Sequence, residues 1–327
     1  MKWHNKLFSL LILCIATFNV NANWQQTQNI NLSKGWNAVY ISVQTSQQDL
    51  ALLFADTPID LVASYFDVAS TVQFIDKPTE QSWKSAVWHK WVAPARKDSF
   101  LTNLYQLNAN RGYLIHVSED YTWQLTGTKK ITKTKWQENA FTLTGFDIDP
   151  NYLPSFTEYF SGSTAHQNLV IYGLYDGEWE LIDDPANTSI MLNQAYWVYS
   201  RGDSTFSSVL SLKNLASTGL NFSSTTTKLT LSIANQGEAP LEFVIQHLTG
   251  KDNSKLVPIS VEQGTIVNKV LVSDLAALDL PVLNAGEYTN VKIIVDRNQI
   301  PQGQTLQSLL LVKGAGAQKI IPISASN

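Results

Sequence analysis

Cysteine is nearly absent from this chain, since Cys14 is the only one in 327 residues. It lies in an apolar run, Leu7 to Phe18, that is too short to span a bilayer and is typical of a secretory signal peptide. Leu13 stands where a lipoprotein signal needs a small residue, so we expect no lipid anchor. Without the signal the chain has no thiol and no disulfide. An exported protein of large modules without disulfides is typical of bacteria.

Positive charge is also scarce. Lys2 and Lys6 precede the apolar run and Val20-Asn21-Ala22 fits the signal-peptidase rule, which predicts a signal peptide over residues 1–22. Its removal lowers Lys plus Arg from 23 to 21 against 27 Asp plus Glu, so the formal charge goes from −4 to −6. Such an acidic chain is unsuited to nucleic acid. No second long apolar segment follows, so we expect an exported protein, periplasmic or extracellular, with no membrane anchor.

Sequence motifs of catalysis are missing as well. The mature chain has four histidines, isolated in sequence: His89, His116, His166 and His247. There is no HExxH and no Gly-x-Ser-x-Gly, which removes the usual sequence signs of a metalloprotease or serine hydrolase. We therefore expect a protein that is not an enzyme. A secreted hydrolase stays as a third hypothesis, because catalytic groups can come together from distant parts of a chain.

Aromatic residues, in contrast, are plentiful. They make up 11% of the chain against 15% for charged residues, a balance that favours a β-rich protein over a helical bundle. The length allows two or three domains. We predict a mainly β chain of two tandem homologous β-rich modules with short helices, followed by an immunoglobulin-like antiparallel β-sandwich.

The two modules are predicted from a repeated order of strands. Module 1, residues 23–128, opens with the strand Gly35 to Val43 and closes with the strand Arg111 to Val117. Module 2, residues 129–213, repeats this order more loosely, as a diverged copy. Its opening strand places Phe141 at the position of Trp36, and a hairpin with an Asp-Gly turn precedes its closing strand. Any pocket is expected at the interface between the modules, related by a pseudo-twofold axis.

Tryptophans recur with the modules. In the alignment of the two copies, Trp179 takes the place of Trp91 in the hairpin. Trp36, Trp91, Trp179 and Trp197 therefore have the pattern of core residues that fill the space between β layers.

The third region, residues 214–327, has a different composition. Tryptophan disappears, and Ser, Thr, Val, Leu and Ile dominate. Alternating segments are separated by turn residues and predict an antiparallel sandwich. The expected strands are Lys228 to Ile233, Leu241 to His247, Leu256 to Val261, Thr289 to Val295, Leu306 to Val312 and Lys319 to Ile323.

Two short motifs carry a resemblance to known proteins. Gly35-Trp36-Asn37 at a strand start, with Gly112-Tyr113-Leu114-Ile115 or Ala195-Tyr196-Trp197-Val198 at the end, resembles a duplicated "GWN…GYW" module of uncharacterised bacterial secreted or cell-surface proteins. The tail, with its Leu229 to Gly237 strand, looks like the immunoglobulin-type domains attached to such proteins. The resemblance covers about 290 residues and implies a non-catalytic extracytoplasmic protein. It supplies no active-site residues.

Two tryptophans are candidates for binding carbohydrate. Trp83 and Trp88 lie in a polar segment with Lys84, His89 and Lys90, which favours exposed indoles. Exposed indoles can stack on sugar rings, because both surfaces are broad and weakly polar. The alternative is that these rings also fill the core.

A weaker pattern resembles a calcium loop. Asp147, Asp149, Asn151 and Glu158 fall at positions 1, 3, 5 and 12 of an EF-hand-like loop, whose oxygens suit Ca²⁺. Position 6 is Tyr152, where that loop needs glycine. The alternative is a polar strand end followed by a short helix. We expect no cofactor, with Ca²⁺ the one ion for which the pattern leaves room.

Three hypotheses follow for the function. The first is a structural or adhesive protein of the bacterial cell envelope or secreted matrix, whose partners are other envelope or extracellular proteins. The second is a carbohydrate-binding protein that uses Trp83 and Trp88, with a polysaccharide as partner. The third is the hydrolase, which needs a cleft with two carboxylates or a histidine beside a nucleophile.

Overall fold

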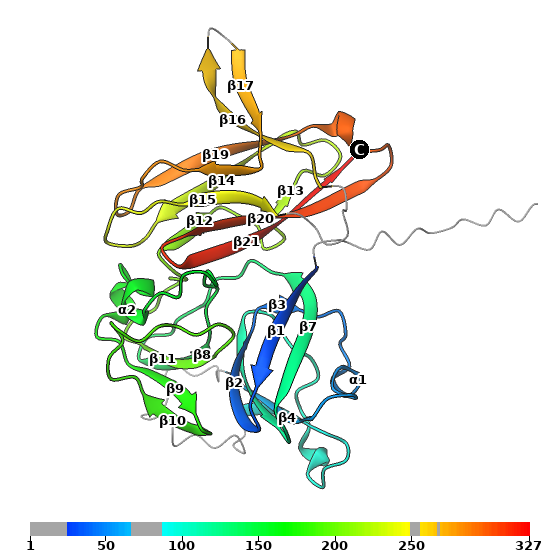
Figure 1. The fold of residues 1–327 in the computed structure, drawn as a ribbon, viewed down its shortest axis with the longest axis vertical. Coiled ribbons are helices and arrows are strands. Elements are labelled where there is room, and N and C mark those ends of the chain that lie inside the picture. Colours follow the sequence, from blue (N-terminus) through cyan, green and yellow to red (C-terminus); the bar gives the residue numbers. More distant parts are fainter. Residues whose placement is uncertain (1–24, 67–86, 249–255, 267–268) are drawn as a thin grey trace, which may run out of the picture.

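The structure is a computed structural model that describes residues 25–66, 87–248, 256–266 and 269–327. It is mainly β, as predicted, with five sheets and a few short helices. Modules 1 and 2 lie side by side, and the C-terminal sandwich covers one end of both (Figure 1). In the described ranges, no helix has the length and apolarity needed to cross a membrane.

Module 1 contains two antiparallel sheets. The larger has the order β2-β6-β4-β5 and the smaller the order β1-β7-β3. Their strands are β1 (Gln25–Leu32), β2 (Gly35–Ile41), β3 (Val43–Gln44), β4 (Ile59–Tyr65), β5 (Trp88–Val92), β6 (Arg111–Val117) and β7 (Tyr121–Lys129). Alternate side chains of the two sheets meet in an apolar core that includes Trp91 and Trp123. A helical turn, α1 (Leu50–Leu53), and a 3₁₀ turn, η2 (Ser99–Leu101), lie between strands.

Module 2 repeats the larger sheet. Its strands are β8 (Ala140–Thr144), β9 (Ile171–Tyr175), β10 (Glu178–Leu181) and β11 (Tyr196–Ser200). The order β8-β11-β9-β10 is that of β2-β6-β4-β5, with every pair antiparallel. A helical turn, α2 (Phe156–Tyr159), follows the first strand, as α1 does in module 1. The 3₁₀ turn η3 (Thr164–His166) precedes β9. Shared strand order and helix position confirm the predicted duplication.

The closing strand of each module has the same local structure. Tyr113 and Tyr196 are buried, and each phenolic oxygen accepts a hydrogen bond from the backbone N–H five residues earlier, at 2.7 and 3.0 Å. Asn110 and Asn193, three residues before each tyrosine, both have a positive φ, of 59° and 62°. Asparagine tolerates this left-handed conformation, which reverses the chain into the strand.

The strand pairing corrects one detail of the alignment. Trp179 pairs with Leu174, and Leu174 corresponds to Tyr65, the partner of Trp88. Trp179 therefore stands at the position of Trp88 and not at that of Trp91. The alignment from sequence placed Trp179 too far along the hairpin. The tight turn at Asp176-Gly177 sets the pairing of β9 with β10, and this pairing brings Trp179 opposite Leu174.

The two large sheets pack face to face around a pseudo-twofold axis. Gly112 of module 1 lies against Leu143 of module 2, so closely that an added Cβ would be 2.8 Å from the Leu143 side chain. The equivalent residues make the reverse contact, because the Ala195 N–H of module 2 donates to the Ala38 carbonyl of module 1 at 3.0 Å. Such reciprocal contacts are the signature of a twofold interface. Gly145 lies against Tyr40, to which it is equivalent, so this contact is on the axis. The interface contains the rings of Tyr65, Trp88, Phe141 and Trp197.

The C-terminal region is an immunoglobulin-like sandwich of two five-stranded sheets around one apolar core. One sheet has the order β12-β14-β19-β16-β17 and the other β13-β21-β20-β15-β18. The strands are β12 (Leu210–Lys213), β13 (Leu220–Asn221), β14 (Lys228–Asn235), β15 (Val244–Leu248), β16 (Ile259–Ile266), β17 (Lys269–Asp274), β18 (Ala277–Asp279), β19 (Tyr288–Val295), β20 (Thr305–Gly314) and β21 (Ala317–Ser326). All pairs are antiparallel except β13 with β21, and the 3₁₀ turn η5 (Arg297–Gln299) follows β19. The six predicted strands are present. Because β12 pairs with β14, the sandwich begins at Leu210, ahead of the boundary predicted at residue 214.

Candidate functional site

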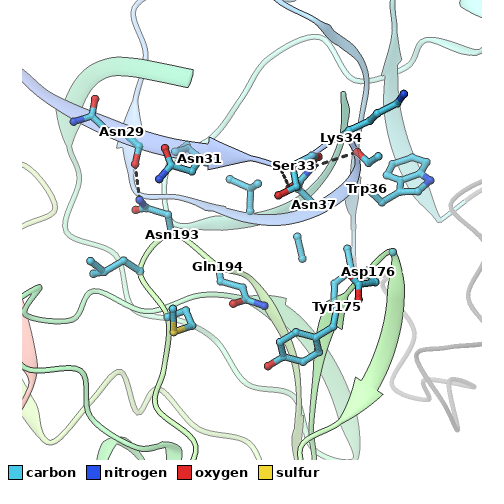
Figure 2. Close-up of a pocket in the computed structure, with 18 residues that line it drawn as sticks. Asn29, Asn31, Ser33, Lys34, Trp36, Asn37, Tyr175, Asp176, Asn193 and Gln194 are labelled. Carbon is cyan, nitrogen blue, oxygen red and sulfur yellow. Dashed lines mark hydrogen bonds between the residues drawn. The ribbon is translucent and has the colours of Figure 1, made fainter. Parts of the chain in front are cut away.

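A groove of about 860 Å³ lies between modules 1 and 2. This position agrees with the expectation that a pocket lies at the pseudo-twofold interface. Its walls come from four segments: β1, the chain from Ser33 into β2, the β9–β10 turn, and residues 191–194 before β11 (Figure 2). We call it the intermodule groove.

One wall is held by hydrogen bonds that cross between the modules. The Asn193 Nδ2 donates to the Asn29 carbonyl at 2.8 Å, and its Oδ1 accepts from Gln28 Nε2 at 3.0 Å. Gln28 is buried and also donates to the Tyr40 carbonyl. The Tyr40 N–H in turn donates to the Asn193 carbonyl at 2.7 Å. The loop of module 2 is therefore fixed against β1 and β2, and the groove is preformed.

The Gly-Trp-Asn motif shapes the opposite end of the groove. Asn37 closes the turn between β1 and β2, because its Oδ1 accepts from the Ser33 N–H at 2.9 Å and its Nδ2 donates to the Ser33 carbonyl at 2.8 Å. Gly35 has a φ of 100°, which few other residues adopt. Trp36 is half-buried and lies edge-on to His116, with ring centroids 5.2 Å apart. The asparagine of the motif is thus structural, and the tryptophan reaches the groove.

The β9–β10 turn forms the facing wall. Asp176 and Gly177 have φ values of 48° and 84°, which is the tight hairpin turn predicted from the sequence. The turn carries Tyr175, whose side chain is 38% exposed and whose ring comes from the module 2 side of the groove (Figure 2). Trp36 comes from the module 1 side, so the groove has an aromatic ring on each of two walls.

The polar lining is made mostly of amides. Four asparagines and one glutamine line the groove: Asn29, Asn31, Asn37, Asn193 and Gln194. Its two charged residues have opposite signs, Lys34 and Asp176. Among the described residues that line the groove there is no histidine and no second carboxylate, so these residues assemble neither a carboxylate pair nor a histidine–nucleophile pair.

Trp88 contradicts the predicted carbohydrate site. Its side chain is 0% exposed, because β5 directs it into the intermodule interface, where it packs against Tyr65 and Trp197. Ring centroids of Trp88 and Trp197 are 6.0 Å apart, in an edge-to-face arrangement. A buried indole cannot stack on a sugar. Trp83 lies outside the described residues.

In the predicted calcium loop, two of the acids bind lysines. Asp147 Oδ1 lies 3.1 Å from Lys129 Nζ, and Asp149 Oδ2 lies 2.8 Å from Lys313 Nζ. Burial alone would raise the pKa of both carboxyls, but the lysines lower it overall. Residues 147–149 pair with the tip of the β20–β21 hairpin through Ile148 and Ala317. The Asp149–Lys313 pair therefore fixes module 2 to the C-terminal sandwich, whereas Asp147 pairs with the end of β7.

The other two members of that loop have local roles. Asn151 donates to the Asp149 side chain. Glu158 completes a capping box at the start of α2, where it accepts from the Ser155 N–H at 2.7 Å. This backbone hydrogen bond lowers the pKa of Glu158. In the described part of the chain, no three acidic, histidine or cysteine side chains are grouped as metal ligands.

One histidine does lie beside a nucleophile. Ser163 Oγ is 2.7 Å from His166 Nδ1, next to a second hollow of about 600 Å³ beside α2. His166 is 3% exposed between the rings of Phe160 and Trp136, and burial lowers its pKa to about 4. Its Nε2 has no hydrogen-bond partner among the described residues. A general base works best with a pKa near the operating pH, so this pair has the features of a packed core and not of a catalytic dyad.

Comparison with known proteins gives no family and only distant structural similarity. No family model and no curated protein matches this chain. Among solved structures, it is similar to the E. coli chaperone DraB (14% identity, TM-score 0.25, covering 36% of this chain and 53% of that one). It is also similar to a PapD-like domain of human CEP192 (12%, TM-score 0.22, 36% and 84%) and to the Vibrio cholerae VesB protease (11%, TM-score 0.21, 92% and 99%). The functional assignment therefore rests on the groove.

Proposed function

We propose that this chain is an exported, non-enzymatic binding protein of the bacterial cell envelope or secreted matrix, and that its ligand lies in the intermodule groove. The preformed groove at the pseudo-twofold interface, lined by amides and two aromatic rings, is the observation that carries the proposal. Export is supported by the signal peptide predicted over residues 1–22, and the class of protein by the GWN…GYW resemblance.

The chemistry of the groove supports binding over catalysis. General acid–base hydrolysis of a glycoside uses two carboxyl groups, whereas Asp176 is the only carboxylate that the described part of the chain places in the groove lining. Amide side chains donate and accept hydrogen bonds without titrating near neutral pH. They are suited to hold a ligand and not to move a proton.

The test is retention of the mature protein, from Asn23 onward, on envelope and matrix material from the producing cells. Ser33 is exposed at the groove, so Ser33→Trp should fill it and reduce co-sedimentation by roughly tenfold or more, as expected for a blocked hot spot. Ser224→Trp places the same ring at an exposed site on the sandwich and should bind as the parent does.

Two results would count against the proposal. Equal retention of the Ser33→Trp and parent proteins would show that the groove is not the binding site. Release of soluble products from the matrix material by the parent protein, abolished by Ser33→Trp, would instead identify an enzyme.

A further inference from the structure

We infer that the ligand of the intermodule groove is an uncharged polysaccharide, which binds in the groove through Tyr175 and the unpaired amide groups of β1 and the segment before β11. This inference deepens the proposed function and rests on it.

The first observation is the exposed ring of Tyr175. The ring packs directly over the backbone of Gly173, so closely that a Cβ added to Gly173 would lie 2.6 Å from the Tyr175 Cε2. The tight turn at Asp176 and Gly177 follows at once, so the ring is held at a defined place. An aromatic ring fixed in this way offers a flat apolar face to the C–H groups of a sugar ring, with little entropy lost on binding. Trp36 provides a second ring across the groove.

The second observation is the state of the amides. Gln194 Oε1 accepts from the Tyr196 hydroxyl at 3.1 Å, and Asn31 Oδ1 accepts from Thr122 at 3.0 Å, so the Nε2 and Nδ2 donors of these residues are unused within the described chain. The Asn29 side chain, which is exposed, makes no hydrogen bond to the described residues and offers both a donor and an acceptor. Sugar hydroxyls are donors and acceptors at once, and amides complement them in both directions.

The third observation is charge. Lys34 and Asp176 balance one another, and the remaining polar lining is neutral. An anionic polymer would need a cluster of Lys and Arg, which the described lining does not contain. The groove therefore favours a neutral chain.

The β2 wall of the groove is also poorly suited to an extended peptide. Peptides commonly bind by adding a strand to an exposed sheet edge. On β2 this edge is already used by module 2, because Tyr40 donates to the Asn193 carbonyl and Ala38 accepts from the Ala195 N–H. The volume of about 860 Å³ lies near the upper end of the roughly 300–1,000 Å³ range of ligand pockets, which leaves room for more than one sugar ring.

The experiment titrates the mature protein with four neutral polysaccharides (dextran, a β-1,3-glucan, a galactan and a mannan), with the anionic alginate and with a random peptide library. Binding is followed by intrinsic tryptophan fluorescence and by calorimetry. We expect saturable binding of a neutral polymer, weakened roughly tenfold by Tyr175→Ala, since truncating an aromatic anchor costs more than about 1 kcal/mol. Tyr175→Phe should retain most of the affinity, because it keeps the ring.

Tyr105→Ala is the matched control, since Tyr105 is 72% exposed and lies outside the groove. It should bind as the parent does. Binding of alginate or peptide alone, or of none of the neutral polymers, would overturn the polysaccharide inference. If Ser33→Trp still abolished retention on envelope material in that case, the proposed binding function would stand and only the ligand class would be wrong.

Discussion

Replacing Trp88 by alanine distinguishes the two roles that the sequence allowed for this residue, which are stacking on a sugar ring and filling the core. Its indole is fully buried in the intermodule interface, beside Tyr65 and Trp197. We expect Trp88→Ala to destabilise the paired modules strongly and to leave ligand affinity unchanged wherever the protein is still folded.

The magnitude follows from the burial and the neighbours. Removing a fully buried tryptophan costs about 3–5 kcal/mol, the sum of lost transfer free energy and the cavity that remains. The neighbouring rings belong to two different sheets, so collapse around the cavity would require the modules to shift. The Trp88 Nε1 has no hydrogen-bond partner among the described residues, so Trp88→Phe removes an unsatisfied donor and should cost clearly less.

The assay is urea unfolding followed by far-UV circular dichroism, which does not depend on the indole that is removed. The free energies of the parent, Trp88→Ala, Trp88→Phe and the exposed control Tyr105→Ala are compared at equal m-values. A Trp88→Ala protein within about 1 kcal/mol of the parent would refute the packing described here, because core truncations of this size cost more. Loss of ligand binding without loss of stability would restore Trp88 as a binding residue.

Three further predictions concern the charged and titrating groups. Because burial lowers the folded-state pKa of His166 to about 4 from about 6.5 in an unfolded chain, the unfolded state binds more protons between these values. The free energy of unfolding should therefore fall by up to about 3 kcal/mol as the pH drops from 6.5 to 4. His166→Gln should show a shallower slope in pH-dependent urea unfolding, with the part due to the half-buried His247 retained; an unchanged slope would contradict it. Asp149→Asn should cost about 1.5–3 kcal/mol, the usual worth of a hydrogen bond to a charged group, because Lys313 loses its partner. Millimolar Ca²⁺ should leave the melting temperature unchanged, and a rise that Asp149→Asn abolishes would revive the metal site.

The fold could be predicted because it depends on local patterns. Alternation, turn glycines and the repeated strand order are each visible in a few consecutive residues, and they gave the two modules and six strands of the sandwich. β12 was missed because the short segment Leu210–Lys213 has no turn on its N-terminal side to mark it as part of the sandwich.

The exposure of Trp88 was predicted wrongly because charged neighbours were taken as a sign of solvent. Lys90 lies on the same strand and is itself only 6% exposed. A lysine stem can lie along apolar surface while its ammonium reaches a polar environment, so a nearby lysine does not establish an exposed segment. The missing information was the second sheet that packs on β5.

The lysine partners of the acidic loop were missed for a related reason. Its spacing satisfied a local template, but the lysines that bind Asp147 and Asp149 come from β7 and β20, the latter far along the chain. Local spacing cannot reveal such partners. The groove residues were missed in the same way, because Asn29, Tyr175 and Gln194 lie on separate segments and none belongs to a motif.

The groove also shows where the two copies have diverged. Two of its five amide side chains, Asn29 and Asn31, come from β1, which pairs with β7 along eight residues. In module 2 the corresponding pairing is reduced to an isolated bridge between Trp136 and Ser204, and Trp136 is buried. The large sheets keep the twofold relation because their packing depends on it, whereas β1 contributes to the core of module 1 and not to the intermodule core. Asn29 and Asn31 therefore lie on an element that the twofold interface does not constrain, where selection for a ligand can act without disturbing that interface.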